Sequence, residues 1–490
     1  MKLLLIQPLG NLVNPGSFVR NCVIEPIGLE YVASLAKTEL DDVLVKHPIN
    51  NLDELLSIIS EFQPDIVGFS VYTYAYNICL KWAQKIKSHF PHIINLFGGY
   101  HPSLKYDEII YEDAIDFVIR GEGEKSISYF LKWIKGEKIK TPGLIYVNDS
   151  KELIINEPQR IKNLEFLPRP LRDDNFIKQS KSFQIMYPPP SEQKSLAQVD
   201  FSRGCIHNCD FCCSKLLWGK EVTWHNNERV INEIESLYEK YQTNLIYFCD
   251  PNITNSRKKL IDLCNALINA DLPVYWWCYC RVDELDKELL LKMKAAKAVK
   301  ITVGIEVSGE RKIKEYKKTN INWNYFIDIF NYAHEIGLIV RGTFMMDFPG
   351  ANSQYYSNFK DFLINLPVDD IRISFCTPFP KTQMSKYCDN NIEVFDDYTT
   401  DVPVLNCEGY RSEELIKLRK DLVNIFYSSD NYLKLIINKT KLYKQLAASY
   451  LEYFDFAYEH NVLYKETYNR IIKTLNKSTE FFVNKKIFTE

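Results

Sequence analysis

Three cysteines at spacings of four and three residues, Cys205, Cys209 and Cys212, point most directly to chemistry in this sequence. They follow a predicted strand, so they lie in a loop that can wrap to bring three sulfurs to one side. Soft thiolates select an iron–sulfur cluster or zinc, and three ligands leave one metal position open. An open position favours catalysis, since a structural zinc site normally closes with a fourth ligand. A zinc site completed by His207 or Cys213 is the alternative.

Polar residues follow the next three predicted strands as well. Asp250 and Asn252 come after LIYFC, Arg281 after WWCYC, and Glu306 and Ser308 after ITVGI. The carboxyl ends of parallel strands share one face, and barrel active sites assemble on that face. The alternative for each residue is a solvated polar group at a strand end.

A series of strands and helices must position these residues. Between 196 and 385, six apolar strand segments alternate with helical patterns, which predicts a partial (β/α)6 barrel of the TIM type. Residues 1–140 show a similar alternation, with continuous Val, Ile and Leu runs typical of a parallel sheet covered on both faces. They predict a doubly wound, Rossmann-like α/β domain, whose ligand binds beyond the carboxyl ends of the strands.

Two further segments complete the predicted organisation. Residues 141–195 contain many prolines, including Pro188–Pro190, and predict a linker with a small hairpin, because successive prolines cannot occupy a central strand. From 386 to 490 strand signals fade, and the Tyr- and Lys-rich tail from 411 has the periodicity of amphipathic helices. We interpret 386–490 as a helical C-terminal lid domain, and its tyrosines as core packing.

Composition narrows the partners and the location. The 490 residues are 46% apolar and 25% charged, and a net charge of -3 gives no general attraction to nucleic acid or anionic membrane. No stretch approaches the ~18 apolar residues that span a bilayer. Thirteen cysteines scattered through a chain without a secretory signal do not predict a disulfide framework. We therefore expect a cytoplasmic protein that binds neither nucleic acid nor membrane.

The pattern C-x3-C-x-F-C after the first strand of a six-strand βα series resembles the radical S-adenosylmethionine (SAM) superfamily, over most of residues 196–385. The resemblance implies that Cys205, Cys209 and Cys212 bind a [4Fe–4S] cluster whose fourth iron binds SAM. It also implies that Phe211 packs toward the adenine. Cys213 falls outside the pattern.

The same resemblance implies further SAM contacts at the strand ends. Asp250 and Asn252 would hold the methionine amino group. Arg281 would hold the carboxylate, because a guanidinium binds a carboxylate through two hydrogen bonds. Glu306 and Ser308 would meet the ribose hydroxyls.

An α/β domain before such a barrel, with GGYHPS after one strand and VIRGEGEKS after the next, resembles the cobalamin-binding radical SAM family over residues 1–385. Adjacent glycines let the backbone approach a bulky ligand, and hydroxyl-bearing loops can hydrogen bond a nucleotide tail. Taken singly, the first motif is also compatible with a bare turn and the second with a helix cap. The implied cobalamin loops are Gln7–Asn14, Ser70–Tyr76, Gly98–Ser103 and Gly121–Lys125, with contacts from Gln7, Ser70, Tyr72, Thr73, Tyr74, Gly98, Gly99, His101, Gly121, Glu122 and Gly123.

One feature departs from cobalamin domains of the methionine synthase type. Those domains carry Asp-x-His-x-x-Gly after the first strand, and the histidine binds cobalt. The stretch from Gln7 to Pro15 has no histidine, and His47 follows a different strand and is predicted to be an ordinary surface residue. The resemblance therefore implies a cobalt without a protein imidazole, its lower face covered by the Ser70–Tyr76 loop.

The resemblance implies an enzyme that transfers a methyl group from methylcobalamin to an unactivated carbon or to phosphorus, in a small-molecule or peptide substrate. A 5′-deoxyadenosyl radical, released when the reduced cluster cleaves SAM, would activate the substrate, and flavodoxin or ferredoxin would supply the electron. The alternatives are a cobalamin-dependent cyclase or ring-rearranging enzyme and a non-catalytic cobalamin-binding sensor. A methylthiotransferase is disfavoured, because the extra N-terminal cysteine set is not found.

Overall fold

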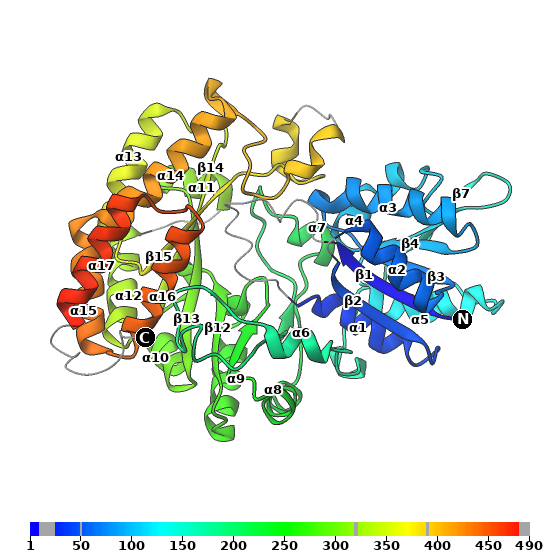
Figure 1. Cartoon of the computed structure of the whole chain (residues 1–490), viewed down its shortest axis with the longest axis horizontal. Helices are drawn as coiled ribbons and strands as arrows, with labels where there is room; N and C mark the ends of the chain where they lie inside the picture. Colours follow the sequence, from blue (N-terminus) through cyan, green and yellow to red (C-terminus); the bar gives the residue numbers. More distant parts are fainter. Residues whose placement is uncertain (9–24, 50, 318–321, 389–391, 480–490) are drawn as a thin grey trace.

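The computed structural model describes residues 1–8, 25–49, 51–317, 322–388 and 392–479. Two mainly parallel sheets organise this part of the chain, and helices pack on both (Figure 1). The predicted loop Gln7–Asn14 lies outside the described residues from position 9 onward.

The first sheet forms the predicted doubly wound domain. Its order is β2-β1-β3-β4-β5-β6-β7, and the strands from β2 to β5 pair in parallel. Helices α1 and α5 cover one face, and α2, α3 and α4 cover the other. The elements are β1 Leu3–Pro8, α1 Ile27–Ala36, β2 Val43–Ile49, α2 Leu52–Phe62, β3 Ile66–Ser70, α3 Tyr76–His89, β4 Ile94–Gly98, α4 Tyr100–Ile109, β5 Phe117–Ile119 and α5 Gly123–Ile134.

The linker contributes to this sheet. The predicted hairpin is present as β6 (Leu144–Val147) and β7 (Leu153–Ile155), and β6 pairs antiparallel with β5. The hairpin thus covers the edge that β5 would otherwise expose. One short helix, α6 (Asp174–Gln179), lies between the hairpin and the second sheet.

The second sheet is the predicted partial barrel. Six parallel strands follow the order β15-β14-β13-β12-β11-β8, so β8 and β15 are edge strands and the barrel does not close. Its elements are β8 Leu196–Val199, α8 Asn227–Tyr241, β11 Leu245–Phe248, α9 Arg257–Ala270, β12 Tyr275–Cys280, α10 Lys287–Ala295, β13 Ala298–Glu306, α11 Glu310–Lys317, α12 Trp323–Glu335, β14 Ile339–Met346, α13 Ser353–Asn365 and β15 Asp370–Phe375.

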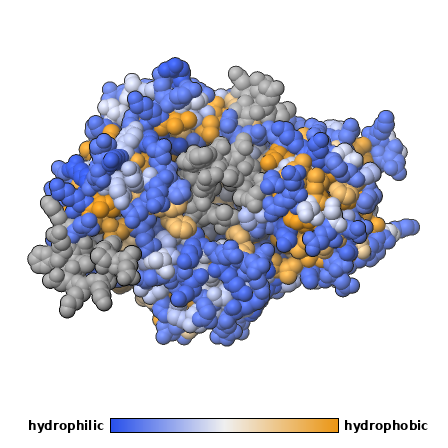
Figure 2. Space-filling view, viewed as in Figure 1, coloured by the Kyte–Doolittle hydropathy of each residue, from blue (hydrophilic) through white to orange (hydrophobic). Residues whose placement is uncertain are grey.

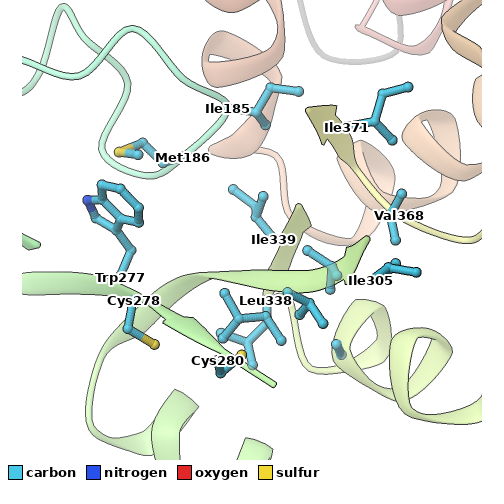
Figure 3. Packing of buried hydrophobic residues seen from close by; sticks show 14 of the residues in the cluster. Ile185, Met186, Trp277, Cys278, Cys280, Ile305, Leu338, Ile339, Val368 and Ile371 are labelled. Carbon is cyan, nitrogen blue, oxygen red and sulfur yellow. The ribbon is translucent and has the colours of Figure 1, made fainter. Parts of the chain in front are cut away.

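Apolar side chains fill the barrel interior. Figure 3 shows Met186 of the linker over Trp277 of β12, with Ile339 of β14 nearby. All three belong to one buried cluster. The outside of the molecule differs, because the face in Figure 2 is mainly hydrophilic with scattered hydrophobic patches. No helix in the described ranges is long and apolar enough to cross a membrane.

The C-terminal helices α14 (Ser412–Ser428), α15 (Asp430–Leu442), α16 (Leu446–Glu459) and α17 (Lys465–Thr479) lie on the side of the barrel opposite the first sheet (Figure 1). Helix α14 runs along β15, with Arg419 against Phe375 at the strand end and Tyr427 against Asp370 near its start. These helices close the open edge of the barrel. The sequence predicted instead that they form a lid over the site.

Buried charges hold these helices in place. We call the following residues the barrel floor, because they lie near the starts of the barrel strands: Lys300, Arg341, Asp369, Asp370 and Lys439. Lys439 of α15 donates to Asp369 at 2.7 Å, and Arg341 donates to Asp370 at 2.5 Å. Four buried tyrosine hydroxyls complete the hydrogen bonds of the two carboxylates and the adjoining backbone: those of Tyr427, Tyr432, Tyr450 and Tyr453. The predicted role in core packing is correct for these four tyrosines and wrong for Tyr458, which is exposed.

Another part of the predicted lid does reach the first domain. Residues 392–401, which we call the strap, include the short helix η8 (Ile392–Asp397). Phe395 and Tyr398 of the strap pack into the apolar core of the first sheet. Asp401 at its end accepts hydrogen bonds from Arg372 of β15 and Arg419 of α14. The strap therefore ties the barrel side to the first domain.

Candidate cofactor sites

The three predicted cluster cysteines lie in a loop with a closed base. Strand β9 (Ser202–Arg203) pairs antiparallel with β10 (Thr223–Trp224), so residues 204–222 leave and return at one point. The backbone is tight there: Gly204 has a φ of +104°, and a Cβ on it would lie 2.6 Å from the Glu221 carbonyl oxygen. Only glycine suits this position, directly before Cys205.

All three thiols are half-buried on this loop. Arg281 Nη1 donates to Cys209 Sγ at 3.6 Å, and Cys212 Sγ donates to Ser214 Oγ at 3.3 Å. Burial raises the pKa of the Cys205 thiol, although Arg281 opposes the shift. A guanidinium beside thiolates suits a cluster that carries net negative charge. No three His, Cys, Asp or Glu side chains in the described ranges stand close enough to hold one metal ion, and a cluster does not require this, because each thiolate binds an iron of its own.

His207, between the cluster cysteines, faces a carboxylate. Its Nε2 lies 2.6 Å from Glu284 Oε1. Glu284 also accepts hydrogen bonds from Asn252 Nδ2 at 2.8 Å and from Thr254 Oγ1 at 2.6 Å. His207, one of the two residues that could complete the zinc alternative, therefore has its Nε2 engaged by Glu284. Asn252, predicted as a SAM contact, lies in this network and orients Glu284.

Asp250 and Arg281 have partners that the sequence does not indicate. The Asp250 carboxylate is 1% exposed and accepts from the backbone N–H groups of Phe201 (3.0 Å) and Ser202 (2.5 Å). Burial raises its pKa to about 7, although hydrogen bonds from Ser202 and Phe201 oppose the shift. Arg281 forms a bidentate pair with Asp283 at 3.0 and 2.7 Å. Asp250 therefore supports the turn before the cluster loop, and Arg281 is held beside the cluster. Their predicted contacts with SAM stay predictions.

The remaining predicted SAM residues lie on the same face. Glu306 ends β13 at a register shift and has a φ of +75°, which strains a residue with a side chain. The Ser308 N–H donates to Tyr355 Oη at 3.1 Å. Phe211 is half-buried against the barrel core. All three stay predicted contacts.

A cavity of about 750 Å³ lies at the carboxyl edge of the first sheet. Its walls include nine of the predicted cobalamin residues: Gln7, Ser70, Tyr72, Tyr74, Gly98, Gly99, Gly121, Glu122 and Gly123. Gly99 has a φ of +97°, and a Cβ there would lie 3.0 Å from Val71 N, so the backbone approaches closely at this loop. The rings of Tyr74 and Tyr100 stack on Tyr72 with centroids 5.5 and 5.2 Å away. The cavity is thus largely apolar and aromatic, as a corrin macrocycle requires.

Two predicted contacts, Thr73 and His101, lie outside the cavity lining. His101 is fully buried, with its ring centroid 4.4 Å from that of Tyr76 and 4.9 Å from that of Phe395. Its Nδ1 lies 3.4 Å from Thr73 Oγ1. Burial lowers the pKa of His101 to about 3. In this structure His101 therefore supports the loop and the strap from behind.

The surface position predicted for His47 is wrong. His47 is buried and lines the cavity, with Nδ1 3.2 Å from the carbonyl oxygen of Gln7. The sequence shows only that a histidine follows a strand, and the fold places the end of β2 beside the end of β1.

The barrel domain also contributes to the cavity wall. Gln198, Asp200, Ser202 and Arg203 precede the cluster loop and Trp218 lies within it, and all five line the cavity. The sequence analysis did not identify Asp200, Arg203 or Trp218. The position of Arg203, two residues before Cys205, was the signal that could have identified it. Tyr31 of α1, another lining residue, carries no such signal.

The matches to known proteins agree with this two-part site. Residues 19–130 match the B12 binding domain, and residues 199–363 match the radical SAM superfamily. An uncharacterized methyltransferase of Pyrococcus horikoshii is 29% identical, over 82% of this chain and 87% of its own length. The anaerobic magnesium-protoporphyrin IX monomethyl ester cyclase of Rubrivivax gelatinosus is 23% identical, over 85% of this chain and 76% of its own length.

Two solved structures share the fold. The methyltransferase TsrM of Kitasatospora setae, with cobalamin and a [4Fe–4S] cluster, has a TM-score of 0.62 at 17% identity, covering 78% of this chain and 77% of TsrM. The enzyme OxsB, with aqua-cobalamin and SAM, has a TM-score of 0.61 at 17% identity, covering 100% of this chain and 82% of OxsB. Fold and site define a radical SAM enzyme with a B12-binding domain. The chain combines the B12-binding and radical SAM domains of cobalamin-binding radical SAM enzymes, and the cofactors of these domains are a [4Fe–4S] cluster, SAM and cobalamin.

Proposed function

We propose that this enzyme transfers a methyl group from methylcobalamin to an unactivated carbon or to phosphorus of a small-molecule or peptide substrate. One observation carries the proposal: the cobalamin cavity is walled by the first domain and by residues that flank the cluster cysteines. When bound, the cluster with SAM supplies a radical that activates the substrate, and cobalamin supplies the methyl group. Two cofactors that share one wall can act on one substrate between them.

The residues of this chain perform the positioning. Cys205, Cys209 and Cys212 would hold the cluster, and Arg281 places a positive charge beside it. Four apolar lining residues that also belong to the core between the first sheet and helices α1 and α5 would accept the nucleotide tail: Leu5, Leu96, Ile119 and Ile127. The strap closes the side of the cavity at Thr399, which limits water near the reacting groups.

The relatives favour methyl transfer over the alternatives. The cytidylyl-2-hydroxyethylphosphonate methyltransferase of Streptomyces wedmorensis is 24% identical over 63% of this chain, and the hopanoid C-3 methylase of Methylococcus capsulatus is 23% identical over 74%. The Rubrivivax cyclase keeps cyclisation as the second candidate. Flavodoxin or ferredoxin is the proposed electron donor, and nucleic acid is not a proposed partner.

Isotope transfer tests the proposal. Anaerobically reconstituted enzyme with hydroxocobalamin, reductant and SAM labelled with deuterium on its methyl group should form 5′-deoxyadenosine and pass the label to a substrate. Candidate substrates come from neighbouring pathway genes. Unlabelled but dehydrogenated or cyclised product would support the cyclase, and no 5′-deoxyadenosine would support the sensor.

Cysteine variants provide the matched control. Cys205→Ala, Cys209→Ala and Cys212→Ala should each abolish the cluster, which carries about four irons when complete. Cys213→Ala, adjacent but outside the pattern, should retain it. Stoichiometric zinc in the wild type, or iron loss in Cys213→Ala alone, would contradict the ligand assignment.

The absence of a protein imidazole on cobalt is a separate proposal, and His47 makes it sharper. With the dimethylbenzimidazole base of the cofactor also displaced from cobalt, the electron paramagnetic resonance spectrum of the cob(II)alamin form should lack nitrogen splitting. Splitting that survives isotope labelling of the cobalamin base and disappears in His47→Phe would identify His47 as a ligand and overturn this proposal.

A further inference from the structure

We propose that Arg203 is a positioning residue that couples occupancy of the cobalamin cavity to the order of the cluster loop. It acts within a group of charges between the two domains, which we call the clasp: the buried Glu122, Glu124, Asp200 and Arg203 and the half-buried Arg160. The inference uses the two cofactor sites of the proposed function and does not depend on what substrate is methylated.

Arg203 joins the cluster loop to the first domain directly. It is 7% exposed and lies in β9 at the loop base. Its Nη1 donates to Glu124 Oε1 at 2.5 Å, and its Nε donates to Asp200 Oδ2 at 2.8 Å. Its guanidinium carbon stands 4.9 Å from the centre of the Tyr31 ring. One side chain thus contacts the β5–α5 turn, helix α1 and the end of β8.

Arg160 fastens the same base from the linker. It forms an ion pair with Glu122 at 2.5 Å. Its Nη2 donates to the Arg203 carbonyl oxygen at 2.9 Å and to Thr223 Oγ1 at 3.2 Å, so it holds both strands of the loop base. Its guanidinium also lies 4.8 Å from the Trp218 ring, further along the loop. Glu122 and Glu124 are therefore linked to the loop at three separate points.

The clasp also borders the ligand space. Glu122, Glu124, Asp200 and Arg203 line the cavity, as do Tyr31 and Trp218. A molecule that fills the cavity touches the groups that fix the loop base. Three carboxylates face two guanidiniums in this group, so a neighbouring ligand with amide N–H groups, such as a corrin with its carboxamides, adds donors where acceptors are in excess.

Linkage makes the inference measurable. If both sites use the clasp, bound cobalamin must raise the affinity of the protein for the cluster by the same factor by which the cluster raises its affinity for cobalamin. Coupling of this kind is typically about 5- to 150-fold. We expect a factor of about ten for hydroxocobalamin in the wild type. In Arg203→Gln the coupling factor should fall below about two, because the guanidinium that joins Glu124 and Asp200 is lost.

The experiment uses the full chain, before and after anaerobic reconstitution of the cluster. One arm measures the dissociation constant of hydroxocobalamin with and without the cluster, and the other measures the fraction of iron lost at equilibrium to a competing chelator with and without hydroxocobalamin. Glu124→Gln is the second variant, and Arg203→Lys should keep an intermediate factor. Arg341→Gln is the control, because it removes a buried guanidinium from the barrel floor.

The outcomes separate clearly. Loss of coupling in Arg203→Gln and Glu124→Gln, with coupling retained in Arg341→Gln, supports the inference. A wild type without coupling, an Arg203→Gln variant with full coupling, or equal losses in the control would each overturn it. Neither arm requires SAM cleavage or methyl transfer, so a failed methyl transfer assay leaves this result unaffected.

Discussion

The clasp and the barrel floor use similar chemistry at opposite ends of the barrel strands. The clasp sets three carboxylates against two guanidiniums, and the floor sets Asp369 and Asp370 against Lys300, Arg341 and Lys439. Both are buried. What differs is the space beside them: four clasp residues line the cavity, and no floor residue does.

The floor is completed from within the chain. Four tyrosine hydroxyls from the C-terminal helices bond its carboxylates and the adjoining backbone, so these carboxylates need no ligand. The clasp has one tyrosine of this kind, Tyr31, which donates to Asp200 at 2.8 Å. We infer that a buried ion network beside a cavity contributes to ligand binding. A similar network packed on all sides only holds helices and strands together.

Breaking the floor should give the largest effect on stability. In Asp369→Ala the buried Lys439 ammonium loses its carboxylate, and removing one member of a buried pair costs about 3–5 kcal/mol. Denaturant unfolding measures this loss, and the hydroxocobalamin dissociation constant should not change. The double variant Asp369→Leu with Lys439→Met should recover part of the loss, since no charge is then stranded. A single variant that loses less than about 1 kcal/mol would show that the floor is not the main anchor.

The strap should respond next. Phe395 is 7% exposed and packs on Tyr76 and His101, and truncation of such a ring costs about 3 kcal/mol. Phe395→Ala should therefore release the strap locally. Hydrogen exchange should rise at residues 392–401 and stay unchanged at α14–α17. Equal increases in both regions would mean that the strap and the C-terminal helices unfold as one unit.

Periodicity predicted the two sheets and the alternation of strands and helices in each, because continuous apolar strands separated by amphipathic helices leave few arrangements. The cysteine spacing likewise predicted the cluster loop, because all three cysteines lie within one short segment. Helical periodicity did not reveal which surface α14–α17 cover, since an apolar face does not identify its partner. The Asp369 and Asp370 pair preceded an apolar segment and gave no sign of the cations that meet it.

The clasp was beyond sequence reasoning for a further reason. Arg203 and Glu124 are 79 residues apart, and Tyr31 and Asp200 are 169 apart. Each residue alone is an ordinary polar group near a strand end or on a helix. Only the packing of the two domains brings them together. The same holds for His47 and His101, whose burial depends on neighbouring strands and on the strap.

Acid should weaken the strap region through His101. Its folded-state pKa of about 3 lies below the unfolded-state value of about 6.5, so its contribution to stability is complete above pH 6.5 and is lost as the pH falls toward 3. The loss is at most about 1.4 kcal/mol per pH unit. His101→Gln should unfold with a smaller slope of stability against pH. His334 near the floor has a pKa lowered to about 4, mainly by burial, and should keep its contribution in that variant. An unchanged slope would mean that His101 is hydrated.

The smallest expected effect gives the closest comparison, because one hydroxyl can be removed from each network. Tyr427 donates to Asp370 in the floor at 2.7 Å, and Tyr31 donates to Asp200 beside the clasp at 2.8 Å. Tyr427→Phe and Tyr31→Phe each delete a buried hydrogen bond to a carboxylate and leave the ring in place, and Tyr427→Phe also removes the hydroxyl that contacts Tyr453 Oη and the Ile371 N–H. Each should cost about 1 kcal/mol in unfolding free energy.

Binding should then separate the two variants. Tyr31 lines the cavity and lies against Arg203, so removal of its hydroxyl should weaken hydroxocobalamin binding. A loss of about 1 kcal/mol in binding free energy corresponds to a few-fold rise in the dissociation constant. Tyr427 reaches neither the cavity nor the clasp, so Tyr427→Phe should bind hydroxocobalamin with the dissociation constant of the wild type. Calorimetry on both proteins measures this difference. If both variants weaken binding equally, the floor influences the cavity through the barrel strands, and the distinction between a binding network and a holding network does not apply to this molecule.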